Sequence, residues 1–197
     1  MNYTSGVIRL RYETPLTWVR VVEDDLDAFL RDHASNEHRV SRAAVTLAVQ
    51  HSERTELVRA MVDVSLEELT HFKQVFDLLE ARGAGLGQEF PDPYMRARRK
   101  KLTHPDRDVW LLRRLVLYGV IERRGYERFA MLAEHLSDPG LRAFYVELAR
   151  SEARHYALYL RLARVYFDGA EVDALLDEVL DLEAEIIGAL PLKPALH

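Results

Sequence analysis

The chain has 197 residues and a mass of 22.8 kDa, enough to bury one sizeable core, and its 48% hydrophobic and 30% charged residues are typical of a globular protein. The formal net charge of −5 argues against binding of nucleic acid by the whole surface, although it leaves room for a local basic patch. The absence of cysteine excludes disulfides and any iron–sulfur or rubredoxin-type centre ligated by this chain. We expect a single domain over residues 1–197 in the cytoplasm, because the sequence shows no signal peptide and no apolar run that could span a bilayer.

Hydrophobic periodicity predicts an all-α protein. Residues 1–20 receive no firm assignment, and a short amphipathic helix is expected at 21–33. Four long helices follow, at 34–51, 53–82, 109–135 and 139–166, and an amphipathic helix at 169–190 covers them. Gly83 is suited to end the second long helix, Asp138 with Pro139 to open the fourth, and Asp168 to cap the last, in which we expect no chemistry. Between the second and third long helices, glycines and prolines predict one long crossover.

The same Glu-x-x-His motif occurs on two of the long helices, as Glu68 with His71 and as Glu152 with His155. Residues three apart on an α-helix share a face, one turn from each other, so each carboxylate and imidazole can bind one metal ion together. The apolar stripe of the first of these helices passes through Glu68, whereas Glu67 belongs to its polar face. The pattern therefore places the motifs inside the bundle.

A lone glutamate precedes each motif by about one helix. Glu37 shares a face with small and apolar side chains, and Glu122 lies on an apolar and aromatic stripe, whereas Glu127 falls off that stripe and is expected to pair with Arg123 or Arg124. A buried, ionised carboxylate without a partner costs several kcal/mol, so Glu37 and Glu122 need a cation or a proton. Taken singly, Glu37 fits a solvated position at a frayed helix start equally well, and each histidine fits an ordinary core position.

Taken together, the four glutamates and two histidines resemble the ligand set of ferritin-like di-iron and di-manganese carboxylate proteins. Two divalent cations would neutralise the four carboxylates, and an oxygen-rich set suits iron, or manganese, better than structural zinc. We therefore expect a ferritin-like four-helix bundle with one long crossover, additional N- and C-terminal helices and a dinuclear site for dioxygen or peroxide activation. The expected metal ligands are Glu37, Glu68, His71, Glu122, Glu152 and His155, without further catalytic residues. Glu68 and Glu152 would bridge the metals, Glu37 and Glu122 would be terminal, and each metal would carry one histidine.

A basic run interrupts the crossover, with five positive charges in the six residues from 96 to 101. In a chain of net negative charge, such a run is either a solvated charged face or a patch that contacts phosphates. The residues that would contact RNA are Arg96, Arg98, Arg99, Lys100 and Lys101.

From about residue 25 to residue 166, the chain is similar to the di-iron tRNA hydroxylases of the MiaE family. The similarity is densest at residues 67–75 (EELTHFKQV), 127–133 (ERFAMLA), 144–145 and 151–156 (SEARHY). The neighbours of Glu37 and Glu122 differ from the family's pattern, but the two glutamates themselves are retained.

The resemblance implies a dioxygen-dependent monooxygenase that hydroxylates the isopentenyl tail of the modified adenosine next to the anticodon. It implies two iron ions as cofactor, the anticodon stem-loop of tRNA as partner, contact between the basic crossover and the RNA backbone, and an external reductase. We expect a monomer or a small homo-oligomer that does not associate with membranes. The alternatives are a ferritin-like oxygenase or oxidase of a small molecule, a ferroxidase or peroxidase, and a bundle whose metal serves only stability.

Overall fold

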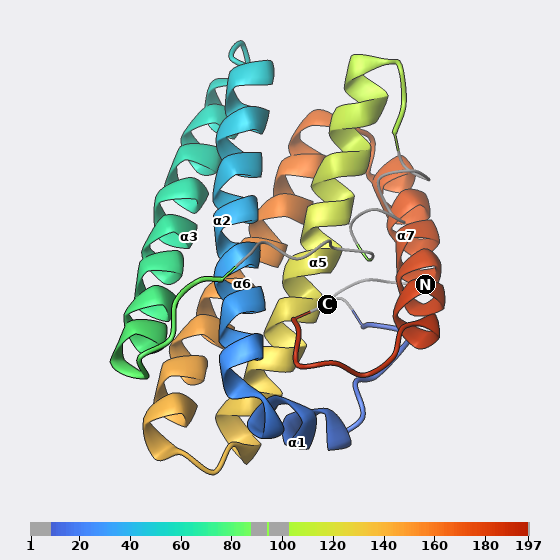
Figure 1. Ribbon diagram of the computed structural model, residues 1–197. Helices are drawn as coiled ribbons and strands as arrows, with labels where there is room; N and C mark the ends of the chain where they lie inside the picture. Colours follow the sequence, from blue (N-terminus) through green and yellow to red (C-terminus); the bar gives the residue numbers. More distant parts are fainter. Residues whose placement is uncertain (1–8, 88–93, 95–102, 197) are drawn as a thin grey trace. The chain divides into compact units, whose positions relative to one another are not determined.

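The computed structural model describes residues 9–87, 94 and 103–196, and the elements within these ranges are helices without any strand, which confirms the all-α class (Figure 1). The helices are α1 (Thr17–Asp24), α2 (Leu26–Gln50), α3 (Thr55–Ala81), α5 (Arg107–His135), α6 (Pro139–Tyr166) and α7 (Gly169–Ala189). None of these described helices combines the length and the apolar composition that crossing a lipid bilayer requires.

The chain folds into two compact units, and neither is a continuous stretch of sequence. The α2–α3 unit comprises Thr17–Pro91 and Leu192–Leu196, and it contains α1, α2 and α3. The α5–α6 unit comprises Met1–Leu16 and Asp92–Pro191, together with the last residue, and it contains α5, α6 and α7. Each unit therefore carries one of the two Glu-x-x-His motifs.

Helix α2 is longer than the sequence pattern indicated. The prediction divided this region between His33 and Ala34, but the helix is continuous over 25 residues, so this boundary was wrong. The break falls instead at Asp25, whose carboxylate accepts a hydrogen bond from the backbone N–H of Ala28 at 3.1 Å and so caps the helix. The segment before Asp25 forms α1, whose first half lies in the stretch up to residue 20 that received no firm assignment. His33 consequently belongs to the same helix as Glu37.

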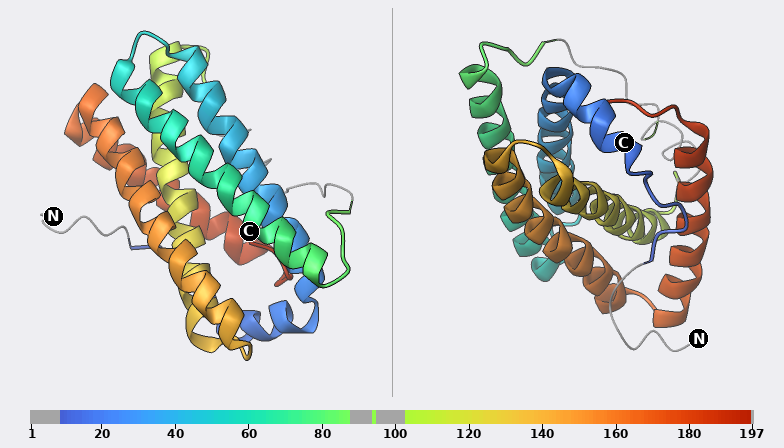
Figure 2. Two further views of the ribbon diagram at one scale, coloured as in Figure 1. Left: turned by 90° about the vertical axis from the view of Figure 1, so that its left-hand side faces the viewer. Right: turned by 90° about the horizontal axis from the view of Figure 1, so that it is seen from below.

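Helices α2 and α3 run side by side as an antiparallel pair (Figures 1 and 2). The hydroxyl of Ser41 donates a hydrogen bond to the backbone carbonyl of Ser65 at 2.9 Å and lies 3.0 Å from the hydroxyl of the same residue. Small side chains at this position allow the two helices to approach closely. Beyond the end of α3, Gly83 adopts a φ of +71°, the left-handed conformation by which glycine ends a helix, as predicted.

Helices α5 and α6 form the antiparallel pair of the other unit (Figure 2). Asp138 caps α6 by accepting a hydrogen bond from the backbone N–H of Leu141 at 2.9 Å, and Pro139 occupies the first turn, as predicted. Gly119 permits a close approach of the two helices, since a Cβ atom at this position would lie 3.2 Å from the side chain of Leu160.

Helix α7 packs against α5 and supplies a buried charge in addition to the expected apolar face. Glu183 of α7 and Arg124 of α5 are both 0% exposed, with Nε–Oε1 and Nη2–Oε2 distances of 2.8 and 3.0 Å. Nη1 of Arg124 also donates to Glu127 at 2.6 Å, which confirms the predicted pairing. The backbone N–H and the hydroxyl of Thr14 each donate to Glu127 at 2.8 Å, so the segment after Leu10 is attached to α5.

Candidate metal centre

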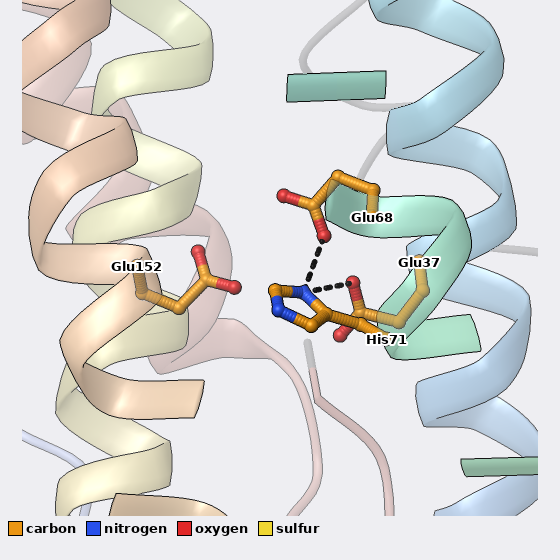
Figure 3. Close-up of side chains that lie close together, drawn as sticks. All are labelled: Glu37, Glu68, His71 and Glu152. Atoms are coloured by element: carbon orange, nitrogen blue, oxygen red, sulfur yellow. Dashed lines mark hydrogen bonds and ion pairs between the residues drawn. The ribbon is translucent and has the colours of Figure 1, made fainter. Parts of the chain in front are cut away.

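The α2–α3 unit brings together Glu37, Glu68 and His71, which we call the first half-site (Figure 3). One potential ligand atom from each of these residues lies within 4.8 Å of the other two. Nδ1 of His71 lies 3.0 Å from Oε2 of Glu68 and 3.8 Å from Oε2 of Glu37. An imidazole nitrogen and two carboxylate oxygens thus face a common point.

Local helix geometry accounts for this arrangement. Glu68 and His71 stand one turn apart on α3 and share its buried face, whereas Glu67 is only half-buried, as the stripe pattern predicted. Glu37 lies in the interior of α2 and is buried, so the alternative of a solvated position at a frayed helix start is wrong. Its carboxylate is therefore held among helix side chains.

The α5–α6 unit brings together Glu122, Glu152 and His155, which we call the second half-site. One potential ligand atom from each residue again lies within 4.8 Å of the other two. Gly125, less than one turn from Glu122 on α5, leaves room for the second carboxylate. A Cβ atom there would lie 3.5 Å from both Cδ and Oε2 of Glu152.

The chemistry of the two half-sites fits a divalent metal. None of the six side chains is more than 7% exposed, so water cannot solvate the two carboxylates in each unit. Buried carboxylates this close together repel each other when both are ionised, and a divalent cation removes both the repulsion and the desolvation penalty. Oxygen ligands with one imidazole per half-site are a donor set suited to iron or manganese.

The predicted RNA-contacting residues lie outside the described part of the chain. They are Arg96, Arg98, Arg99, Lys100 and Lys101. Their role stays a prediction from charge pattern and family resemblance.

Sequence analysis missed one buried residue beside the first half-site. His33 is 0% exposed, and its Nε2 atom lies 2.6 Å from Oε1 of Glu37, one turn further along α2. Burial, reinforced by the nearby His71 and partly offset by Glu68, lowers the pKa of His33 to about 3. The spacing of four residues from Glu37 was the available signal, but the predicted helix boundary separated the two residues.

Comparison with known proteins identifies relatives over nearly the whole length of the chain. Residues 5–197 match the sequence model of the family described as tRNA-(MS[2]IO[6]A)-hydroxylase (MiaE). The chain is similar to a Pseudomonas putida protein named tRNA 2-(methylsulfanyl)-N(6)-isopentenyladenosine(37) hydroxylase, with 35% identity over 174 residues, 88% of this chain and 84% of that protein. A Salmonella typhimurium protein of the same name is 36% identical over 133 residues, which cover 67% of this chain and 48% of that protein.

Among solved structures, the chain is similar to a Synechococcus protein described as protein 43 with aldehyde deformylating oxygenase activity. The TM-score is 0.90 and the sequence identity 31%, over 96% of both chains. This similarity confirms the ferritin-like fold class predicted from the sequence.

Proposed function

We propose that this chain, which belongs to the MiaE family of tRNA hydroxylases, hydroxylates the isopentenyl tail of the modified adenosine next to the anticodon. Membership of the family makes the chain a tRNA-modifying enzyme. The observation that carries the choice of substrate is the similarity to the Pseudomonas putida protein, which extends over most of both chains and whose name specifies this nucleoside.

The proposed cofactor is a pair of iron ions, with manganese as the alternative, for which the two half-sites would supply the ligands. The support is that each half-site offers two buried carboxylates and one imidazole, with the same Glu-x-x-His spacing in both units. The residues that would hold the metals are Glu37, Glu68 and His71 in the α2–α3 unit and Glu122, Glu152 and His155 in the α5–α6 unit. When bound, the two irons would supply the electrons that activate dioxygen, a step that protein side chains cannot perform alone.

In this proposal, side chains of the protein bind the metals, and others keep water away from the site. His71 and His155 each direct a ring nitrogen toward the carboxylates of the same half-site. On α5, Phe129 lies two turns beyond Glu122 on the same face, and its ring packs on that of Tyr145 at a centroid distance of 5.3 Å. Aromatic walls of this kind keep water from a reactive centre and are compatible with an apolar substrate tail.

Several partners belong to the same proposal. Because the chain has no cysteine with which to ligate an electron-transfer cluster, an external reductase would supply the electrons. The anticodon stem-loop of tRNA would contact the basic residues 96–101 through its phosphates. Within the same proposal, the protein acts in the cytoplasm as a monomer or a small homo-oligomer.

A second candidate function is the oxidation of a small molecule such as an aldehyde. The observation that favours it is the 31% identity with the Synechococcus protein of aldehyde deformylating oxygenase activity. The two functions differ in whether RNA is required. Metal-loaded protein supplied with a chemical reductant and dioxygen, but no RNA, would consume an aldehyde under the second function only.

The experiment that tests the proposal is nucleoside analysis of tRNA by mass spectrometry, in cells that lack the gene and in cells resupplied with it. We expect the unhydroxylated isopentenyl nucleoside to accumulate without the gene and to be converted when the gene returns. Resupply with the E68A/E152A double variant should leave it unconverted. An unchanged nucleoside profile in the cells that lack the gene would remove tRNA hydroxylation as the function.

A further inference from the structure

His33 and Glu37 share a buried face of α2. The side chains are 0% and 3% exposed, and Nε2 of His33 lies 2.6 Å from Oε1 of Glu37. A neutral imidazole that faces a carboxylate oxygen at this distance carries its proton on Nε2 and donates it. The hydrogen bond therefore occupies one of the two carboxylate oxygens of Glu37.

The two oxygens of Glu37 have different surroundings as a result. Oε1 accepts the hydrogen bond from His33, while Oε2 lies 3.8 Å from Nδ1 of His71, on the side of the first half-site. Hydrogen bonds to ligand carboxylates fix their orientation and thereby raise the affinity of a metal site. We propose that His33 is a positioning residue that makes Glu37 a one-oxygen ligand, an inference that rests on the proposed metal centre.

His33 is itself held in place by aromatic packing. Its ring lies 5.9 Å from the ring of Phe29, and Phe29 packs edge to face on Trp18 at 5.7 Å, both being centroid distances. Phe29 and Trp18 are 0% exposed, and Nε1 of Trp18 donates to the backbone carbonyl of Lys193 at 3.1 Å. A positioning group needs such packing, because a mobile imidazole would not restrict the carboxylate.

The second half-site has a different residue at the corresponding position. Four residues before Glu122 stands Tyr118, whose ring packs edge to face on Tyr159 at a centroid distance of 5.5 Å. The positioning histidine thus belongs to the α2–α3 unit, and the two metals are expected to bind unequally. Loss of His33 should weaken the binding of one metal ion and leave the binding of the other unchanged.

The test is a titration of the metal-free full-length protein with Co²⁺, followed by visible absorption and equilibrium dialysis. The variant H33F keeps a buried ring but has no donor, H33Q keeps a donor, and Y118F alters the equivalent position of the other unit as a control. We expect two Co²⁺ ions per chain for the wild type and Y118F. For H33F we expect one ion bound as in the wild type and one bound about 10–100-fold more weakly, with H33Q close to wild type.

Circular dichroism and thermal unfolding establish which variants are folded, and H33L replaces H33F should the phenylalanine variant not fold. A purely structural role would lower the melting temperature of the metal-free protein without changing the number of tightly bound ions. Two ions bound at wild-type affinity by a folded variant without a donor would overturn the inference, as would equal losses in H33Q and H33F. A wild-type protein that binds no Co²⁺ would overturn the proposed metal centre, and the inference with it.

Discussion

Arg124 of α5 and Glu183 of α7 form a two-bonded ion pair in which neither side chain reaches solvent, with nitrogen–oxygen distances of 2.8 and 3.0 Å. Burial alone would lower the pKa of Arg124, but hydrogen bonds and charge interactions with Glu183 and Glu127 raise it above its ordinary value. The guanidinium is therefore charged, and it also donates to the hydroxyl of Thr14 at 3.2 Å and to the backbone carbonyl of Tyr12 at 2.8 Å. Removing one partner of a buried ion pair is strongly destabilising, because the other charge is left buried without its counter-ion.

Removing one partner of this pair should destabilise the protein strongly. The R124M variant leaves Glu183 buried without its cation, and we expect the free energy of unfolding to fall by about 3–5 kcal/mol. The free energy of unfolding should fall less in the E183M variant, because Glu127 still neutralises the guanidinium. Urea unfolding measures both, and the double variant R124M/E183M should be more stable than R124M. A double variant less stable than R124M would contradict this account of the pair.

Two neighbouring glutamates of α3 allow a matched test of the metal centre, because one is a candidate ligand and the other is a control. Glu68 is 1% exposed, whereas Glu67 is half-buried on the other face. We expect E68A to lose most of its bound iron and E67A to retain about two ions per chain, the complement of a dinuclear site. Iron analysis after purification without chelators measures both. Equal iron contents in the two variants would argue against the assignment of Glu68.

Gly125 should tolerate a small substitution but not a large one. A Cβ atom there meets Glu152 at 3.5 Å, an ordinary contact, so G125A should bind metal much as the wild type does. The larger side chain of G125L would displace the carboxylate of Glu152, and we expect a metal affinity at least about 10-fold lower. Co²⁺ titration compares the two variants. Gly169 has open space around its Cβ position, so G169A serves as a control with unchanged metal binding.

The N-cap of α7 should contribute measurably to stability. Oδ1 of Asp168 accepts hydrogen bonds from the backbone N–H groups of Ala170 at 2.9 Å and Glu171 at 3.3 Å. Replacing it with alanine leaves these donors without their acceptor, so D168A should lower the free energy of unfolding by about 1 kcal/mol. Urea unfolding of D168A and D168N measures the effect, and the asparagine variant should be close to the wild type. A D168A variant with the same free energy of unfolding as the wild type would mean that water replaces Asp168 as the hydrogen-bond acceptor.

Neutralising the basic run should weaken the binding of tRNA. Replacing Arg98, Arg99, Lys100 and Lys101 with glutamine removes four charges, and the slope of the logarithm of affinity against the logarithm of salt concentration should become shallower. Filter binding of tRNA at several salt concentrations measures the slope. The same affinity and slope in both proteins would assign this run to an ordinary solvated surface.

Sequence periodicity was sufficient to place the six candidate ligands on buried helix faces, because their burial depends on the local spacing of apolar residues. It failed where a boundary had to be chosen. Asp25 and the residues around His33 are all compatible with a helix, and the cap at Asp25 became evident only from its hydrogen bond to Ala28. Because the predicted boundary put His33 and Glu37 on different helices, their contact was not predicted.

Contacts between residues far apart in the sequence could not be predicted from the sequence pattern either. The contact of Arg124 with Glu127, three residues away on the same helix, followed from spacing and is present. Its contact with Glu183 spans 59 residues of sequence and two helices, and no periodic pattern specifies which charge on α7 faces α5. Only the packing of the two helices selects that partner.

The interleaved course of the chain limits how the two half-sites can be studied. The α2–α3 unit needs residues from both before and after the whole of α5, α6 and α7, and the other unit begins ahead of α1. A gene cut at any single point would therefore deprive at least one unit of part of its chain. Mixing separately produced halves would be a poor route to one-metal protein, and point substitutions within the intact polypeptide are the better one.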